Sequence, residues 1–213
     1  MIWHHPIWVA LLAAALALVE GSLSEYWIHR SMHRRGWARR RHGEHHMAGT
    51  GQGWAGEFKD YLSPALPFCV LAFIPSLAIG AGFSAGVILY FAFAAYSHQV
   101  QHERPELVFW MKAPVHHLHH RHHMTRYNYG IGLDIWDRWF GTYQQRQWQP
   151  KQRPRDLRAW FRIQWLARPP TEEQIREESG WRSEPGLERP GARATGERKI
   201  GATRRAGARR AAS

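Results

Sequence analysis

The feature that most constrains the fold of this 213-residue chain is a run of 37 residues, Tyr61 to Ser97, without Asp, Glu, Lys or Arg. A second apolar stretch, Ile2 to Ile28, has no Lys or Arg and only two acidic residues. A soluble domain of this size rarely contains so long an uncharged run, whereas a membrane-crossing helix needs about 20 apolar residues. The sequence therefore predicts an all-α, integral membrane helical protein.

The two apolar stretches have room for about three membrane-crossing helices. We expect the first at Ile7–His33 and the other two at Leu62–Ile79 and Phe83–Gln101. The uncharged Gly80-Ala-Gly82 would form the turn between the last two, and Pro75 would kink the helix before it. Since no basic residue precedes the first stretch, we expect a permanent multi-pass membrane protein rather than a cleaved signal peptide.

Basic residues predict the orientation. Six arginines between Arg30 and Arg41 lie at the end of the first helix and directly after it, and further Lys and Arg residues follow Gln101. Under the positive-inside rule these ends are cytoplasmic. The net charge of +12 could also indicate nucleic-acid binding. That alternative leaves the uncharged run unexplained, so we expect no nucleic-acid partner.

Four groups of histidines recur at helical spacing and would form a cap at the cytoplasmic face. Residues three or four apart lie on one face of a helix, so each group makes a stripe of imidazoles, which are good ligands for Zn, Cu, Fe and Ni. One structural zinc needs about four ligands. A chain with more than twice that number is more consistent with a metal pair. The ten histidines are His29, His33, His42, His45, His46, His98, His102, His116, His119 and His120.

These groups, followed by Asn128-Tyr-Gly130 and Trp136-Asp-Arg-Trp-Phe-Gly-Thr142, resemble the fatty acid hydroxylase/sterol desaturase superfamily over about Glu20 to Thr142. The resemblance implies a di-iron centre held by the same ten histidines, with zinc as a possible substitute and O2 as co-substrate. It also implies attack on a C–H bond of a membrane lipid, such as a fatty acyl chain, a sterol-like lipid or a carotenoid. Hydroxylation is favoured over desaturation.

The resemblance further implies an external electron donor, such as a ferredoxin, a cytochrome b5-like protein or a reductase, because nothing in the sequence resembles a fused haem module. The arginines from Arg34 to Arg41 are interpreted as topological, with binding of an acidic redox partner as the alternative. The rival to an enzyme is a non-catalytic membrane metal-binding or transport protein. Transport would require ionisable residues along the spans, and Tyr61 to Ser97 has none.

Two assignments stay open at this point. His119, His122 and His123 share the spacing of His116, His119 and His120, so His122 and His123 could replace His116 and His120 as ligands. The partners of the ligand rings are the second open assignment. By sequence proximity the candidates are Glu25, Glu44, Glu103, Asp134 and Asp137; Asn128 and Asp137 are expected mainly to stabilise the last turns of the fold.

Composition predicts three parts of the chain. Residues 1–145 would form the membrane-embedded di-iron catalytic domain, with a short helix at Val115–His123. Residues 146–177 mix Trp and Phe with Arg and Lys, as in a segment that rests on a membrane surface. Residues 178–213 lack a hydrophobic period and are expected to be a disordered basic tail.

Overall fold

The computed structural model describes residues 6–34, 37–149, 154 and 156–167. Every regular element in these ranges is a helix, as the sequence predicts. Residues 178–213, expected to be a disordered tail, lie outside the described residues. In chain order the helices are α1 (Pro6–Met32), α2 (Trp37–Ala48), α3 (Trp54–Leu71), α4 (Leu77–Glu103), the 3₁₀ helix η2 (Pro105–Leu107), α5 (Val115–Arg121), α6 (Ile135–Trp139) and the 3₁₀ helix η3 (Leu157–Phe161).

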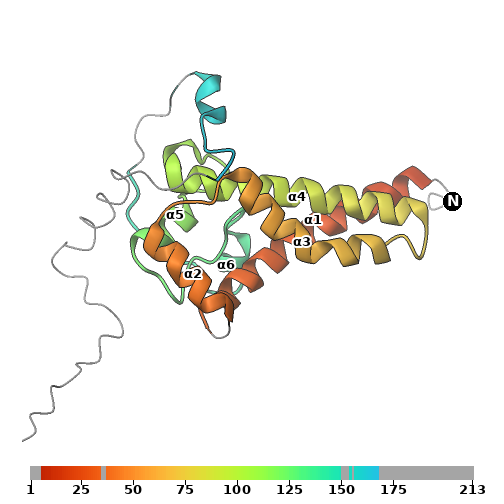
Figure 1. Cartoon of the computed structure of the whole chain (residues 1–213), viewed down its shortest axis with the longest axis horizontal. Coiled ribbons are helices and arrows are strands. Elements are labelled where there is room, and N and C mark those ends of the chain that lie inside the picture. The colour runs from red at the N-terminus through yellow and green to blue at the C-terminus, as the bar shows by residue number, and fades with distance from the viewer. Residues whose placement is uncertain (1–5, 35–36, 150–153, 155, 168–213) are drawn as a thin grey trace, which may run out of the picture.

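The long helices α1, α3 and α4 form an elongated bundle, and α2, α5 and α6 lie at one end of it (Figure 1). The N-terminal end of α1 and the α3–α4 connection lie together at the opposite end. The bundle packs around a core that includes Ala17, Cys69, Val87, Tyr90 and Phe91. This packing brings the C-terminal ends of α1 and α4, where two of the histidine groups lie, to the same end of the molecule.

Small residues allow α1 and α4 to approach each other closely. A Cβ atom added to Gly82 would lie 2.1 Å from the carbonyl oxygen of Ala10, and one added to Gly86 would lie 2.4 Å from that of Ala14. No side chain fits at these distances, so glycine is required at both positions for the helices to touch.

The predicted turn at Gly80-Ala-Gly82 is wrong, because these residues lie inside α4. The helix that precedes the turn begins at Trp54 and ends at Leu71, rather than spanning Leu62–Ile79. Pro75 lies in the connection instead of kinking a helix, and Ser76 caps α4 by accepting a hydrogen bond from the Ile79 amide at 3.2 Å. The connection forms where proline ends one helix and serine starts the next.

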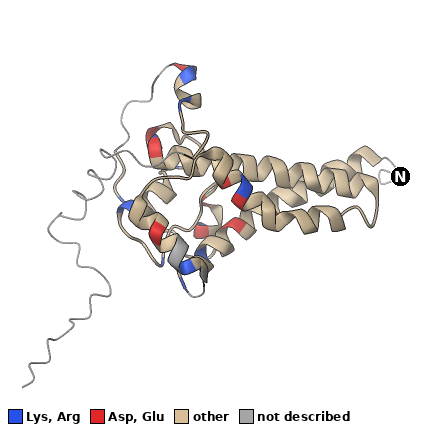
Figure 2. Ribbon diagram, viewed as in Figure 1, with Lys and Arg blue, Asp and Glu red and all other residues tan. Residues whose placement is uncertain are grey.

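Two helices in the described part of the chain, α1 and α4, are long and apolar enough to cross a membrane. Each has 27 residues, which corresponds to about 40 Å of helix. Large apolar side chains such as Leu16 and Ile74 are more than half exposed on the bundle. Lys, Arg, Asp and Glu lie away from the N-terminal end (Figure 2). A membrane protein accounts for this pattern, since water would disfavour so much exposed apolar surface.

The third predicted crossing stays a prediction, as does the cytoplasmic orientation. The helix α3 carries Glu57, Lys59 and Asp60 in its first two turns, and its uncharged part from Tyr61 to Leu71 is short. It nevertheless packs along α4.

The segment that contains η3 packs against the helices near the histidine-rich end. The Trp54 and Ala55 amides donate to the carbonyls of Gln164 and Trp165, both at 2.9 Å. The Gln164 amide in turn donates to the carboxylate of Glu103, at 3.0 Å. The described part of residues 146–177 is therefore anchored to the start of α3 and the end of α4. Leu157 and Phe161 remain exposed there, and the membrane-surface role of this segment stays a prediction.

Candidate metal centre

The fold brings all ten predicted ligand histidines to one end of the bundle. Two come from the end of α1, three from α2, two from the end of α4 and three from α5. Nine of them form two groups, and within each group one ring nitrogen per residue lies within 4.8 Å of the others. Site A consists of His29, His33, His42, His46 and His119, and site B of His45, His102, His116 and His120.

Each of the helices α2 and α5 supplies both sites. On α2, His42 and His46 belong to site A, and His45 belongs to site B. On α5, His119 belongs to site A, while His116 and His120 belong to site B. Residues four apart share a helix face, and the adjacent residue points about 100° away. Each of these two helices therefore lies between the two sites.

His98 is the tenth ring, and it lies beside site B. Its Nε2 atom is 3.3 Å from the Nε2 atom of His102. Its Nδ1 atom is 3.0 Å from the carboxylate of Glu57, and both side chains are buried. Glu57 therefore contacts the ring nitrogen of His98 that does not face His102.

Backbone carbonyls orient several other rings. The Nδ1 atom of His119 lies 2.8 Å from the carbonyl oxygen of Tyr127, and that of His102 lies 2.7 Å from the carbonyl oxygen of Gly49. His29 makes the same contact with the carbonyl of Tyr129. A carbonyl only accepts, so Nδ1 carries the proton in each neutral ring and Nε2 keeps a lone pair directed into the site.

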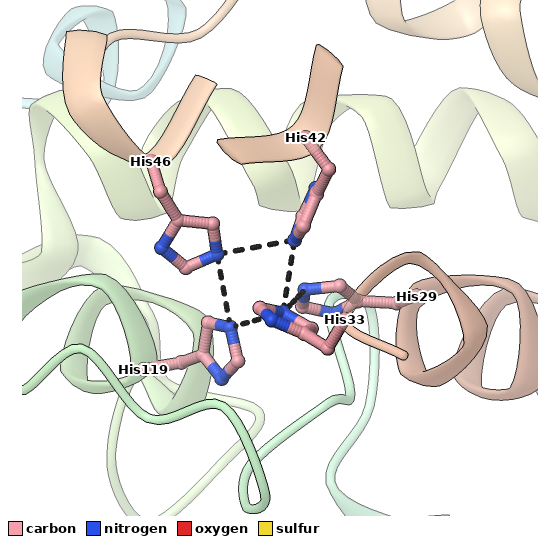
Figure 3. Close-up of side chains that lie close together, drawn as sticks. All are labelled: His29, His33, His42, His46 and His119. Carbon is pink, nitrogen blue, oxygen red and sulfur yellow. Dashed lines mark hydrogen bonds between the residues drawn. The ribbon is translucent and has the colours of Figure 1, made fainter. Parts of the chain in front are cut away.

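The lone pairs in site A face one another. The Nε2 atom of His33 lies 2.9 Å from those of His42 and His119 and 3.3 Å from that of His29. The ring of His46 completes the group, with Nε2 3.1 Å from His42 and 3.2 Å from His119 (Figure 3). Since Nε2 of His29 and His119 cannot donate, hydrogen bonds between the rings cannot satisfy every contact. A cation bound among the rings would interact favourably with all of these lone pairs.

Site B has the same requirement. Both ring nitrogens of His116 and of His120 are buried without a hydrogen-bond partner. A buried polar atom without a partner costs about 1–3 kcal/mol. Nitrogen lone pairs in this number and arrangement suit a transition-metal ion, so the residues of both sites fit a bound metal.

The nine rings of sites A and B are neutral at physiological pH, because burial lowers the pKa of each. Burial lowers the pKa of His33 and that of His45 to about 4. Burial and the neighbouring His33 ring lower the pKa of His119 to about 3. Protonation, which would remove the lone pair, is therefore displaced well below pH 7. The metal-binding form of these imidazoles is the one present in neutral solution.

The loop that orients His29 and His119 is held by two buried carboxylates. Asp137 of α6 accepts hydrogen bonds from the amides of Tyr129 and Gly130, at 2.9 and 2.6 Å. Glu25 of α1 accepts from the next two amides, those of Ile131 and Gly132, at 2.7 and 3.1 Å. Neither carboxylate contacts a ring in these bonds. Both act on the backbone whose carbonyls contact the rings.

Asn128 and Thr142 complete the same loop. Asn128 has a positive φ of 59°, and its side chain bonds to the backbone of Gln144 in both directions. Thr142 donates to Asp137 and lies 2.9 Å from the Tyr26 hydroxyl. The motifs around Asn128 and Asp137 therefore build the support of site A, in agreement with the structural role expected for both residues.

The remaining proximity candidates have other contacts. Glu103 binds Gln99 and the Gln164 amide, and Asp134 pairs with Arg138 at the surface. Glu44 is exposed on α2. Sequence proximity does not indicate Glu57, because no histidine lies close to it in the sequence. Its one signal was an acidic residue at the start of a helix that is otherwise largely apolar.

The described histidines outside the ten, which are His117, His122 and His123, lie outside both sites. His117 contacts the carbonyl of Gln101 through Nδ1 at 3.2 Å. His122 and His123 are exposed and follow the end of α5. The predicted helix Val115–His123 ends at Arg121, and His123 has a left-handed φ of 47°. Of the two sets with the same spacing, the structure places His116, His119 and His120 at the sites, and it does not place His122 and His123 there.

A helical bundle with exposed apolar flanks and two clusters of neutral imidazoles defines a membrane protein with a histidine-rich metal site. A model of the fatty acid hydroxylase family matches residues 14–142, which is more than half of the chain and includes all ten histidines. The chain belongs to the fatty acid hydroxylase family, within the fatty acid hydroxylase/sterol desaturase superfamily. Membership implies an oxidoreductase. No curated protein and no solved structure matches the chain.

Proposed function

We propose that this protein is a membrane-bound oxidoreductase that uses two iron ions and O2 to hydroxylate, or desaturate, a lipid. The observation that carries the proposal is the convergence of buried, neutral imidazoles with lone pairs directed at one another in two neighbouring groups. The five histidines of site A would hold one ion. The other would be held by the four histidines of site B together with His98.

The bound irons would supply the activation of O2 and the oxidising power needed to break a C–H bond. Hydroxylation inserts one oxygen atom of O2 into the C–H bond and reduces the other to water, which consumes two electrons and two protons. The protein contributes neutral ligands that leave the net positive charge on the ions. It also fixes the ring orientations through the carbonyls of Gly49, Tyr127 and Tyr129.

An external redox protein would supply the electrons, as a ferredoxin, a cytochrome b5-like protein or a reductase does. The partly exposed rings of His33 and His42 lie next to the α1–α2 connection. Arg34 and Arg39 are exposed on either side of that connection. A donor with an acidic surface could therefore approach site A at this corner.

The lipid would reach the site from the bilayer, with α1, α3 and α4 crossing the membrane and the histidine-rich end at the cytoplasmic face. Support comes from the apolar exposed surface of the bundle and from the arginines that follow α1. The reacting carbon would then lie close to the membrane surface, because the histidines occupy the ends of α1 and α4.

The test combines metal analysis with a product assay. Protein purified without oxygen should contain close to two metal ions per chain. With a reductant, O2 and a lipid extract, it should yield hydroxylated or desaturated lipid detected by mass spectrometry. His45→Ala should lose metal and product. One ion or fewer per chain, unaffected by His45→Ala, would contradict the metal pair; two ions without oxygen-dependent product would favour the non-catalytic metal-binding alternative.

A further inference from the structure

Glu57 is a buried acid on a helix that supplies no histidine. It lies in the first turn of α3, and 5 % of its surface is exposed. One carboxylate oxygen, Oε1, lies 3.0 Å from Nδ1 of His98 and also accepts the Gln52 amide at 3.0 Å. A buried carboxylate is retained at low cost only when such partners surround it. The geometry makes His98 its side-chain partner.

This contact determines which nitrogen of His98 faces site B. A carboxylate only accepts, so a neutral, metal-binding His98 ring in this contact keeps its proton on Nδ1, and Nε2 then carries the lone pair. That Nε2 lies 3.3 Å from Nε2 of His102, which is itself fixed by the Gly49 carbonyl. The two rings are therefore presented to one ion from consecutive turns of α4.

The contact also makes the two sites different. In site A, the rings of His29 and His119 are oriented by neutral backbone carbonyls. At site B, the partner of His98 is the buried carboxyl group of Glu57, 3.0 Å from Nδ1. A charged partner makes an imidazole a stronger donor to a metal than a neutral one does, and it offsets part of the charge of the ion.

We propose that Glu57 is the positioning residue that holds His98 as the fifth nitrogen ligand of site B, and that its charge strengthens metal binding at this site alone. This inference rests on the proposed metal pair. It assigns to α3 a role in the metal centre that no histidine motif indicates.

A cobalt(II) titration of the full-length, metal-free protein in detergent without oxygen would test the proposal. The absorption of the bound ion should report two binding steps, and the step lost in His116→Ala identifies site B. In Glu57→Ala the dissociation constant of the site B step should rise about 10–100-fold. The site A step should stay unchanged.

Three further variants distinguish the positioning role of Glu57 from the effect of its charge and from a general effect on folding. Glu57→Gln keeps an oxygen for both Nδ1 and the Gln52 amide, so the site B dissociation constant should rise by less than tenfold. Adding Glu57→Ala to His98→Ala should weaken binding no further, because Glu57 acts through that ring. Asp60→Asn, one turn along α3 at an exposed carboxylate, should change neither step.

Each contrary result is informative. Unchanged site B binding in Glu57→Ala overturns the inference and leaves the proposed function standing. Equal weakening of both steps, or an effect of Glu57→Ala that persists in the absence of the His98 ring, also overturns it by showing a role in folding alone. A wild-type protein that binds fewer than two cobalt ions overturns the proposed metal pair, and this inference with it.

Discussion

Replacing Asp137 with alanine should disable the support of site A without touching a ligand. The Asp137 side chain is fully buried and accepts hydrogen bonds from the Tyr129 and Gly130 amides and from the Thr142 hydroxyl. The alanine variant leaves both amides buried without an acceptor. The threonine hydroxyl keeps its contact with Tyr26.

The size of the effect follows from those two amides. A hydrogen bond to a charged group contributes about 1.5–3 kcal/mol, so losing both should lower the free energy of unfolding by about 3–6 kcal/mol. The whole stability of a domain is typically about 5–15 kcal/mol. Loosening the loop also releases the carbonyls that orient His29 and His119. Metal affinity at site A should therefore fall about 10–100-fold, while affinity at site B changes little.

Thermal unfolding of the metal-free protein and a metal titration would measure the two effects separately. Asp134→Ala is the matched control, because Asp134 is the neighbouring acid and pairs with Arg138 at the surface. A surface pair of this kind contributes about 0–1 kcal/mol. The reasoning is refuted if Asp137→Ala unfolds and binds metal like Asp134→Ala, or if it weakens site B instead of site A.

Three further predictions follow from the same geometry. His116→Ala should lose about one metal ion per chain and abolish activity, whereas His123→Ala should retain both ions; the reverse would move the ligand frame by three residues. The metal-free protein should lose stability as the pH falls below about 6.5. In that range the imidazoles of the unfolded chain bind protons, whereas the buried imidazoles of the folded protein, with pKa values near 4 and 3, stay neutral. Each such ring should cost about 1.4 kcal/mol per pH unit down to its own pKa, so a melting temperature that does not change between pH 7.5 and 5 would contradict this. Cysteines at Ile74 and Arg126, in a Cys69→Ala background, should be labelled from opposite sides of the membrane; labelling of both from one side would exclude three crossings.

Helical periodicity was enough to predict the local part of the site. Spacings of three and four residues place His42 and His46 on one helix face and His45 on another, which is how the structure divides them between the sites. The all-α fold followed from the length of the uncharged run. These properties depend on residues close in sequence, so they can be predicted from the sequence alone.

The supporting contacts could not be predicted because they join distant segments. His29 and the Tyr129 carbonyl that orients it are 100 residues apart. Glu57 and His98 meet only once α3 packs along α4. Glycine was ambiguous for a related reason: Gly82 fits a turn as well as a close helix contact, and only its neighbour Ala10 decides between them.

The division of adjacent rings between two sites makes both sites depend on the register of the same two helices. The helices α2 and α5 each contribute rings to both sites. Inserting or deleting one residue within α2 would exchange rings between the sites and damage both.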